Sequence, residues 1–209
     1  MKIGIIGAGN VGGALAKGLR EAGHEVRITS RSGKSAEDVA SRTGASPVGN
    51  NRDAVEGAEV VILAVPSDTL EQVAAEIEGA ISGAIVVDPS NRVDMDDPGS
   101  TLDGSSNAER LQELLPNGRV VKAFNTAFST HQEDPTVEGM PIDGFVAADD
   151  ESARKTVLDL AGEIGFRPVD TGPLVFARAL EAMAALLITL QVRHGWNWEN
   201  GWRIIGPTG

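Results

Sequence analysis

A glycine-rich hexapeptide near the N-terminus carries the clearest chemical signature in the sequence. It reads Gly7-Ala8-Gly9-Asn10-Val11-Gly12 and directly follows the apolar run 2–6. Between a strand and a helix, the first glycine permits a tight turn, the second lets the backbone approach a pyrophosphate, and the third allows close packing of helix and strand. The free N–H groups and positive dipole end of the helix then favour phosphate. This context favours dinucleotide binding over a purely structural turn.

A second group of residues predicts which dinucleotide is bound. The expected second strand, 25–29, is followed by Ser30, Arg31 and Lys34, and no Asp or Glu lies between Arg27 and Ser35. Sites that prefer NAD place an acidic side chain near this strand end to bind the ribose 2′-hydroxyl. A guanidinium instead matches a 2′-phosphate with two parallel hydrogen bonds. We therefore expect NADP(H); the alternative is a solvated loop with two incidental cations.

Strand and helix patterns alternate along the chain and must position these residues. Apolar runs predict strands at 2–6, 25–29, 59–65, 84–87, 119–124, 142–147 and 166–169, with helices between and after them. This alternation is typical of a mostly parallel, doubly wound α/β sheet of the Rossmann type. We expect residues 1–173 to form the NADP(H)-binding domain. Residues 174–209 are then a small helical addition that packs on this domain or on a second subunit.

Three serines mark predicted helix starts. The stretches Ser35-Ala36-Glu37-Asp38 and Ser106-Asn107-Ala108-Glu109 each have the pattern of a capping box. Ser67, which follows Pro66, is predicted to be the N-cap of a helix ending at Ile77.

Several polar residues follow the later strands. Ligands of open parallel sheets lie beyond the carboxyl ends of the strands. Val65 and Pro66 should therefore border the cofactor, and Asn91 and Asn125 should lie near the nicotinamide and its reaction partner. Lys122 is predicted to be either another polar contact there or an outward-facing strand residue.

The sequence offers no convincing acid–base or metal-binding arrangement. The three histidines are far apart and there is no cysteine. Asp94, Asp96 and Asp97 are expected to form a solvated loop rather than a metal site. We predict no catalytic side chain and no metal. Carbonyl reduction generally needs a proton donor, whereas hydride exchange between two cofactor rings needs chiefly proximity and orientation.

Composition limits the partners. The 209 residues carry a net charge of −12, which argues against nucleic acid and anionic membranes. The apolar stretch 174–192 is interrupted by Arg178, Glu181 and Gln191, so we interpret it as a core or interface helix rather than a membrane span. Nothing precedes the first strand that could be a signal peptide, and we expect a cytoplasmic protein.

The sequence resembles the NADP oxidoreductases that depend on the deazaflavin coenzyme F420, over nearly the whole chain. The glycine loop, Ser30-Arg31, Ala64-Val65-Pro66, the run 120–126 and the distinctive run 167–174 carry the resemblance. It implies hydride transfer between NADP(H) and the deazaflavin, with residues 174–209 serving the acceptor site and a homodimer contact. The iron-reductase domains of certain membrane metalloreductases look similar and use a flavin.

The resemblance also implies roles for individual residues. Ala8 to Val11 would hold the pyrophosphate, and Ser30, Arg31 and Lys34 would hold the 2′-phosphate. Val65 and Ala127 would line the nicotinamide side.

The sequence departs from the family pattern at two places, and these departures bear on the identity of the hydride acceptor more than on the binding of NADP(H). Ala8 stands where archaeal members often carry a Thr, and the tail 195–203 holds three tryptophans. These rings either stack on a ligand or pack on their own subunit or its dimer mate. Two other functions therefore stay open: NADPH-dependent reduction of another flavin, a quinone or a small imine or carbonyl, and non-catalytic NADP(H) sensing.

Overall fold

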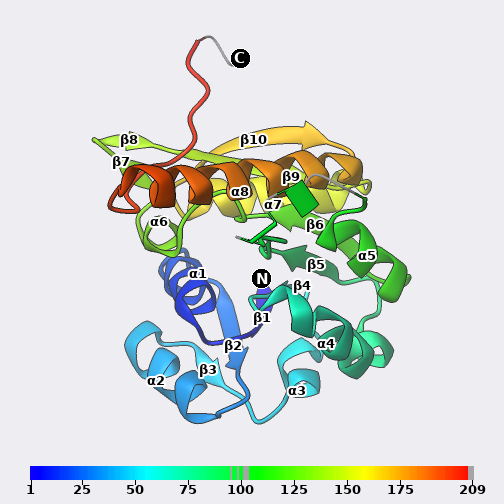
Figure 1. Ribbon diagram of the computed structural model, residues 1–209. Helices are drawn as coiled ribbons and strands as arrows, with labels where there is room; N and C mark the ends of the chain where they lie inside the picture. The colour runs from blue at the N-terminus through cyan, green and yellow to red at the C-terminus, as the bar shows by residue number, and fades with distance from the viewer. Residues whose placement is uncertain (95, 98, 101–103, 207–209) are drawn as a thin grey trace.

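The protein is built on a central twisted sheet. The structure, a computed structural model, describes residues 1–94, 96–97, 99–100 and 104–206. Among these residues an eight-stranded sheet has the order β10-β9-β6-β5-β4-β1-β2-β3 (Figure 1). Its strands are β1 (Lys2–Ile6), β2 (Glu25–Thr29), β3 (Ser46–Pro47), β4 (Val60–Leu63), β5 (Ile85–Asp88), β6 (Arg119–Ala123), β9 (Asp143–Ala147) and β10 (Arg167–Gly172).

All neighbouring strands of this sheet are parallel except β6 and β9. Between β6 and β9 the chain forms the short helix α6 (Ser129–Glu133) and a hairpin of β7 (Thr136–Val137) and β8 (Met140–Pro141). The predicted mostly parallel, doubly wound α/β sheet of the Rossmann type is confirmed.

Helices cover both faces of the sheet. Alternate strand residues such as Ile3 and Ile5 pack with α1 (Asn10–Glu21), α2 (Lys34–Thr43) and α7 (Glu151–Glu163). The opposite face packs with α3 (Asn51–Val55), α4 (Leu70–Ile77) and α5 (Asn107–Leu114). Short 3-10 helices are η1 (Ser67–Thr69), η2 (Glu78–Ala80) and η4 (Leu174–Phe176). Because both faces are covered, β4 and β5 are buried along their whole length.

The C-terminal helix α8 (Ala177–His194) lies beside β9 and β10 (Figure 1). Leu180 packs on Phe145 of β9, and Glu181 is fully buried. The segment Leu174–His194 is long and apolar enough to span a membrane by length and composition alone. Its outward side exposes apolar residues such as Leu186, which is 50% exposed. The helix thus presents one face to the sheet and leaves one apolar face uncovered.

The tail after α8 packs on its own subunit. The Trp202 carbonyl accepts a hydrogen bond from the Asp143 N–H at 2.9 Å, and its ring joins the Phe145 cluster. The Asp143 carboxylate accepts from the Ile204 N–H at 2.7 Å and from Arg167 at 2.5 Å, which raises the pKa of that guanidinium. For Trp202, packing on its own subunit is therefore the correct interpretation.

The helix starts test the capping predictions. The Ser106 box is confirmed, because the Ser106 hydroxyl accepts from the Glu109 N–H and the Glu109 carboxylate accepts from the Ser106 N–H. The Ser35 box is wrong: α2 begins at Lys34 after Gly33. Ser67 as N-cap is also wrong, because the chain forms the 3-10 turn η1 after Pro66 and α4 begins only at Leu70.

Candidate functional site

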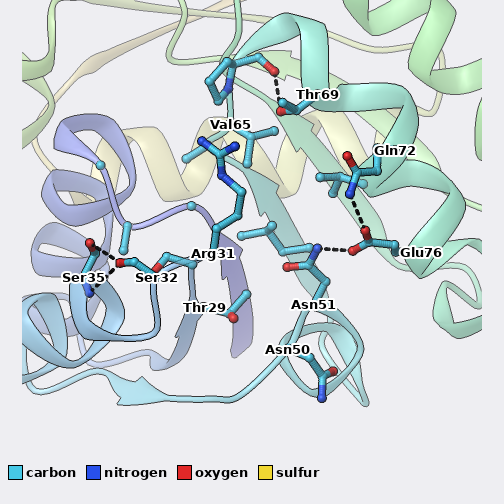
Figure 2. A pocket seen from close by; sticks show the side chains of 18 of the residues that line it. Thr29, Arg31, Ser32, Ser35, Asn50, Asn51, Val65, Thr69, Gln72 and Glu76 are labelled. Carbon is cyan, nitrogen blue, oxygen red and sulfur yellow. Dashed lines mark hydrogen bonds between the residues drawn. The ribbon is translucent and has the colours of Figure 1, made fainter.

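A cavity of about 620 Å³ lies at the carboxyl ends of β1, β2 and β4 (Figure 2). Its walls come from the glycine loop, the segment after β2, the segment before α3, the segment after β4, and α4. The lining residues are Ile6, Gly7, Ala8, Gly9, Thr29, Ser30, Arg31, Ser32, Ser35, Gly49, Asn50, Asn51, Ala64, Val65, Pro66, Thr69, Gln72, Val73 and Glu76. Residues that the sequence predicts to bind the cofactor at the ends of β1, β2 and β4 therefore line one cavity. They are Gly7, Ala8, Gly9, Ser30, Arg31, Val65 and Pro66.

The glycine loop is shaped by two close approaches and one open position. A Cβ on Gly7, whose φ is +110°, would lie 2.0 Å from the Ala64 carbonyl oxygen. A Cβ on Gly12 would lie 1.9 Å from the Gly7 carbonyl oxygen. A Cβ on Gly9 would meet no described atom within 4 Å. Gly7 and Gly12 therefore serve the packing of the loop, whereas Gly9 keeps space open at the start of α1. The exposed Asn10 and the half-buried Val11 begin α1 and do not line the cavity.

The segment after β2 offers unused hydrogen-bonding groups. The Ser30 hydroxyl oxygen is buried and has no partner among the residues that the structure describes. Within the same residues no ion pair or hydrogen bond engages the Arg31 guanidinium, which extends into the cavity (Figure 2). A buried polar atom without a partner is costly, and a free guanidinium suits a phosphate. Lys34 is exposed at the start of α2 and does not line the cavity.

The wall opposite the glycine loop was missed by sequence reasoning. Thr69, Gln72, Val73 and Glu76 follow the spacing i, i+3, i+4, i+7 and so lie on one face of the segment that contains α4. The Glu76 carboxylate accepts from Gln72 at 2.9 Å and from Asn51 at 2.6 Å. The polar residues within the amphipathic pattern of α4 are the sequence feature from which this wall of the cavity could have been predicted.

The ends of β5 and β6 form a second polar region, outside the cavity. Asn91 donates to the Asn125 carbonyl oxygen at 2.9 Å, and Asn125 donates to the Asn91 side-chain oxygen at 2.8 Å. The Asn125 side-chain oxygen is buried without a partner in the described part of the chain. Ala127 is half-buried nearby along the chain, and its carbonyl accepts from Gln132 at 3.3 Å. Asn91 and Asn125 are therefore brought together, but none of these residues lines the cavity.

Lys122 lies in a buried ion cluster. Its ammonium group donates to Asp88 at 2.8 Å, to Glu181 at 2.8 Å and to the Ser90 carbonyl at 2.5 Å, and all three charged side chains are 0% exposed. Since the three ammonium protons are used within the protein, both sequence interpretations of Lys122 are wrong. The sequence hid this cluster because Glu181 is 59 positions away on the last helix.

The contact between α5 and α8 surrounds this cluster. The Glu181 carboxylate also accepts from the Asn107 backbone N–H at 2.8 Å and faces Arg92 at 3.3 Å. Further out, Arg178 donates to Glu109 through two nitrogens. These hydrogen bonds from Arg178, followed by those from Ser106, lower the pKa of Glu109 to about 2.

Two of the histidines, His24 and His194, contact neighbouring side chains and do not line the cavity. His24 lies between the N-terminal amine of Met1, at 3.3 Å, and Glu163, at 2.7 Å. His194 stacks on Trp196 with ring centroids 4.9 Å apart. Within the described ranges, no group of three His, Cys, Asp or Glu side chains is arranged to hold a metal ion.

Comparisons with known proteins agree with this geometry. A family model described as NADP oxidoreductase, coenzyme F420-dependent, matches residues 2–92. The F420-dependent NADP reductase of Methanocaldococcus jannaschii is 34% identical over 93% of this chain and 94% of that protein. A crystal structure assigned to F420-dependent NADP reductases, from Arthrobacter sp. FB24, has a TM-score of 0.87 at 26% identity and covers 99% of this chain and 100% of that chain.

A second kind of relative is also similar. The metalloreductase STEAP3 of Rattus norvegicus is 30% identical over 90% of this chain, which spans only 37% of that protein.

Proposed function

Because the chain belongs to the family of coenzyme F420-dependent NADP oxidoreductases, we propose that it transfers a hydride between NADP(H) and coenzyme F420. The observation that carries the proposal is the cavity in which the Ser30 hydroxyl and the Arg31 guanidinium have no protein partner within the described chain. A 2′-phosphate supplies the oxygens that both groups lack. The residues present therefore fit NADP(H).

We propose the following division of the site. The backbone from Gly7 to Gly12, with Ala8, Gly9, Asn10 and Val11, binds the pyrophosphate at the N-terminus of α1. Ser30 and Arg31 hold the 2′-phosphate, and the exposed Lys34 adds charge from outside the cavity.

The nicotinamide end extends from the cavity toward the ends of β5 and β6. Val65 and Pro66 line its near side, and Ala127 contributes an apolar side further on. Asn91 and Asn125 lie where polar contacts to the ring substituents are needed, and the buried Asn125 oxygen supports this assignment.

The chain's own residues act by binding, orientation and exclusion of water. The bound nicotinamide supplies the hydride, and direct transfer between two flat rings depends mainly on their proximity and alignment. We assign no side chain a proton-transfer role. The buried Lys122 cluster holds α8 against the strand ends and so shapes the acceptor side.

A turnover experiment separates this proposal from its alternatives. The protein is mixed with NADPH and either F420, FMN, a quinone or a small imine, and nicotinamide absorbance is followed. Oxidation of NADPH with F420 alone supports the proposal. Turnover with FMN favours the second candidate, a reductase of another flavin, for which the similarity to the metalloreductase is the specific observation. Binding without turnover indicates a sensor.

We also propose that residues 1–173 form the NADP(H)-binding domain and residues 174–209 complete the acceptor site and a homodimer contact. The apolar outer face of α8, with Phe176 48%, Leu186 50% and Val192 59% exposed, supports the contact. In analytical ultracentrifugation, the wild-type protein should have the mass of a dimer and the Leu186→Glu variant the mass of a monomer. If the wild-type protein and the variant have the same mass, this interface is excluded.

We further propose that the protein works in the cytoplasm, without a membrane or nucleic acid partner. The net charge of −12 and the buried Glu181 on α8 support this. Recovery of the native protein in the membrane fraction would contradict it.

A further inference from the structure

The carboxylate of Glu76 stands out in a cavity proposed to hold a highly negative dinucleotide. Among the described residues that line the cavity, Arg31 and Glu76 carry the only charged side chains. Arg31 extends from the end of β2, and Glu76 lies on the α4 wall (Figure 2). A negative group at this position repels phosphates and requires a different ligand feature, a hydrogen-bond donor.

Two amides fix the Glu76 carboxylate at the cavity wall. Gln72 donates to one oxygen at 2.9 Å and Asn51 donates to the other at 2.6 Å (Figure 2). Arg52 donates to the Glu76 backbone carbonyl at 3.1 Å, which fixes the end of α4 as well. Each carboxylate oxygen accepts more than one hydrogen bond, so acceptor capacity remains on the cavity side.

The position of this wall matches one part of the cofactor. The cavity lies between the segment after β2 and α4 and so surrounds the adenosine half, while the nicotinamide half extends toward β5 and β6. Adenine offers a 6-amino donor beside the N7 acceptor, and Asn or Gln side chains pair with these two atoms. A carboxylate flanked by two amides presents the matching acceptor and donors.

We propose that Glu76, held by Gln72 and Asn51, reads the 6-amino group of the adenine ring and makes the cavity select a 6-aminopurine over a 6-oxopurine. This inference rests on the proposed binding of NADP(H) in the cavity. Hypoxanthine replaces the amino group with a carbonyl oxygen, which faces the carboxylate without a proton between them. Losing a hydrogen bond to a charged acceptor at an exposed site should weaken binding about tenfold.

The test compares NADPH with deamino-NADPH, in which hypoxanthine replaces adenine, by isothermal titration calorimetry. Wild-type protein should bind NADPH about tenfold more tightly, and Glu76→Gln should reduce the ratio of the two Kd values to about twofold or less, because a Gln amide also donates to a carbonyl. The matched control is Glu71→Gln. Glu71 lies on the same helix, pairs with Arg110 and does not line the cavity, so the wild-type ratio should persist.

The outcomes distinguish this inference from the function on which it rests. Equal Kd values for the two dinucleotides in wild-type protein, with NADPH still preferred over NADH, would overturn the reading of adenine and leave the proposed function standing. Failure to bind any of the three would overturn the proposed function itself. An unchanged ratio in Glu76→Gln would assign the selectivity to other groups and overturn the role of Glu76.

Discussion

The cavity beside β2 and the ion cluster beside β6 differ in whether their polar side chains have partners within the protein. In the cavity, the Ser30 hydroxyl and the Arg31 guanidinium have no partner within the described chain. In the cluster, Lys122 contacts Asp88, Glu181 and the Ser90 carbonyl, and its three charged side chains are fully buried. Unsatisfied polar groups indicate a place for a ligand, whereas satisfied buried charges hold elements together. The cavity is therefore suited to binding a ligand, whereas the ion cluster stabilises the fold.

The largest expected effect is on stability, at the cluster. Lys122→Met leaves the Asp88 carboxylate buried without its cation and leaves Glu181 with Arg92 alone as a cation, so the free energy of unfolding should fall by about 3–5 kcal/mol. Denaturant unfolding measures this. The control is Lys155→Met, which removes an exposed ammonium that contacts Asp159 and should cost less than about 1 kcal/mol.

If Lys122→Met and Lys155→Met cost the same, the cluster does not hold α8 on the sheet. Should Lys122→Met fail to fold, Glu181→Gln gives a milder variant in which a hydrogen-bond acceptor remains.

The next effect is on binding, at the cavity. Arg31→Ala should weaken NADPH by about 1.5–3 kcal/mol, roughly 10- to 150-fold, because it removes a charged contact to the 2′-phosphate. NADH affinity and the free energy of unfolding should change little, since Arg31 has no partner in the described chain. Calorimetric titration with both cofactors measures the difference. Arg42→Ala, an exposed cation of α2 outside the cavity, is the control, and an equal loss for NADH and NADPH would show that Arg31 does not read the phosphate.

The two regions also differ in how far the sequence predicts them. The glycine loop and Ser30-Arg31 lie next to their strands, so local patterns are enough to predict both the fold and one end of the cavity. Glu181 and Lys122 are 59 positions apart, with β9, α7 and β10 between them in the sequence. Contacts at such separation leave no periodic signal. Ser35 and Ser67 are not caps because Gly33, two residues before Ser35, is already the N-cap of α2, and Pro66, directly before Ser67, leads into a 3-10 turn.

A smaller effect tests the solvent side of the α5–α8 contact. Arg178 and Ser106 lower the pKa of Glu109 to about 2, from 4.5 in the unfolded chain. The ionised form therefore stabilises the fold fully above about pH 4.5, and this contribution is lost as the pH falls toward 2.

Glu109→Gln should accordingly cost about 1 kcal/mol near pH 7, a value reduced by solvent screening at Arg178. The difference from wild-type protein in the free energy of unfolding should shrink between pH 4.5 and 2.5. Urea unfolding at several pH values measures it. A difference that is independent of pH would mean that the charge of Glu109 contributes nothing.

The smallest expected effect on stability is that of a substitution at Gly9, in the glycine loop of the cavity. Gly9 has φ −82°, which any residue adopts, and a Cβ there meets no described atom within 4 Å. Gly9→Ala should therefore change the free energy of unfolding by less than about 0.5 kcal/mol, while its methyl group enters the space proposed for the pyrophosphate and weakens NADPH. Gly12→Ala is the contrasting variant, because its Cβ would lie 1.9 Å from the Gly7 carbonyl oxygen and destabilise the fold. Thermal unfolding and NADPH titration of both variants separate the two roles of glycine. If the Gly9→Ala variant binds NADPH as tightly as the wild-type protein, the proposal that this loop binds the pyrophosphate is wrong.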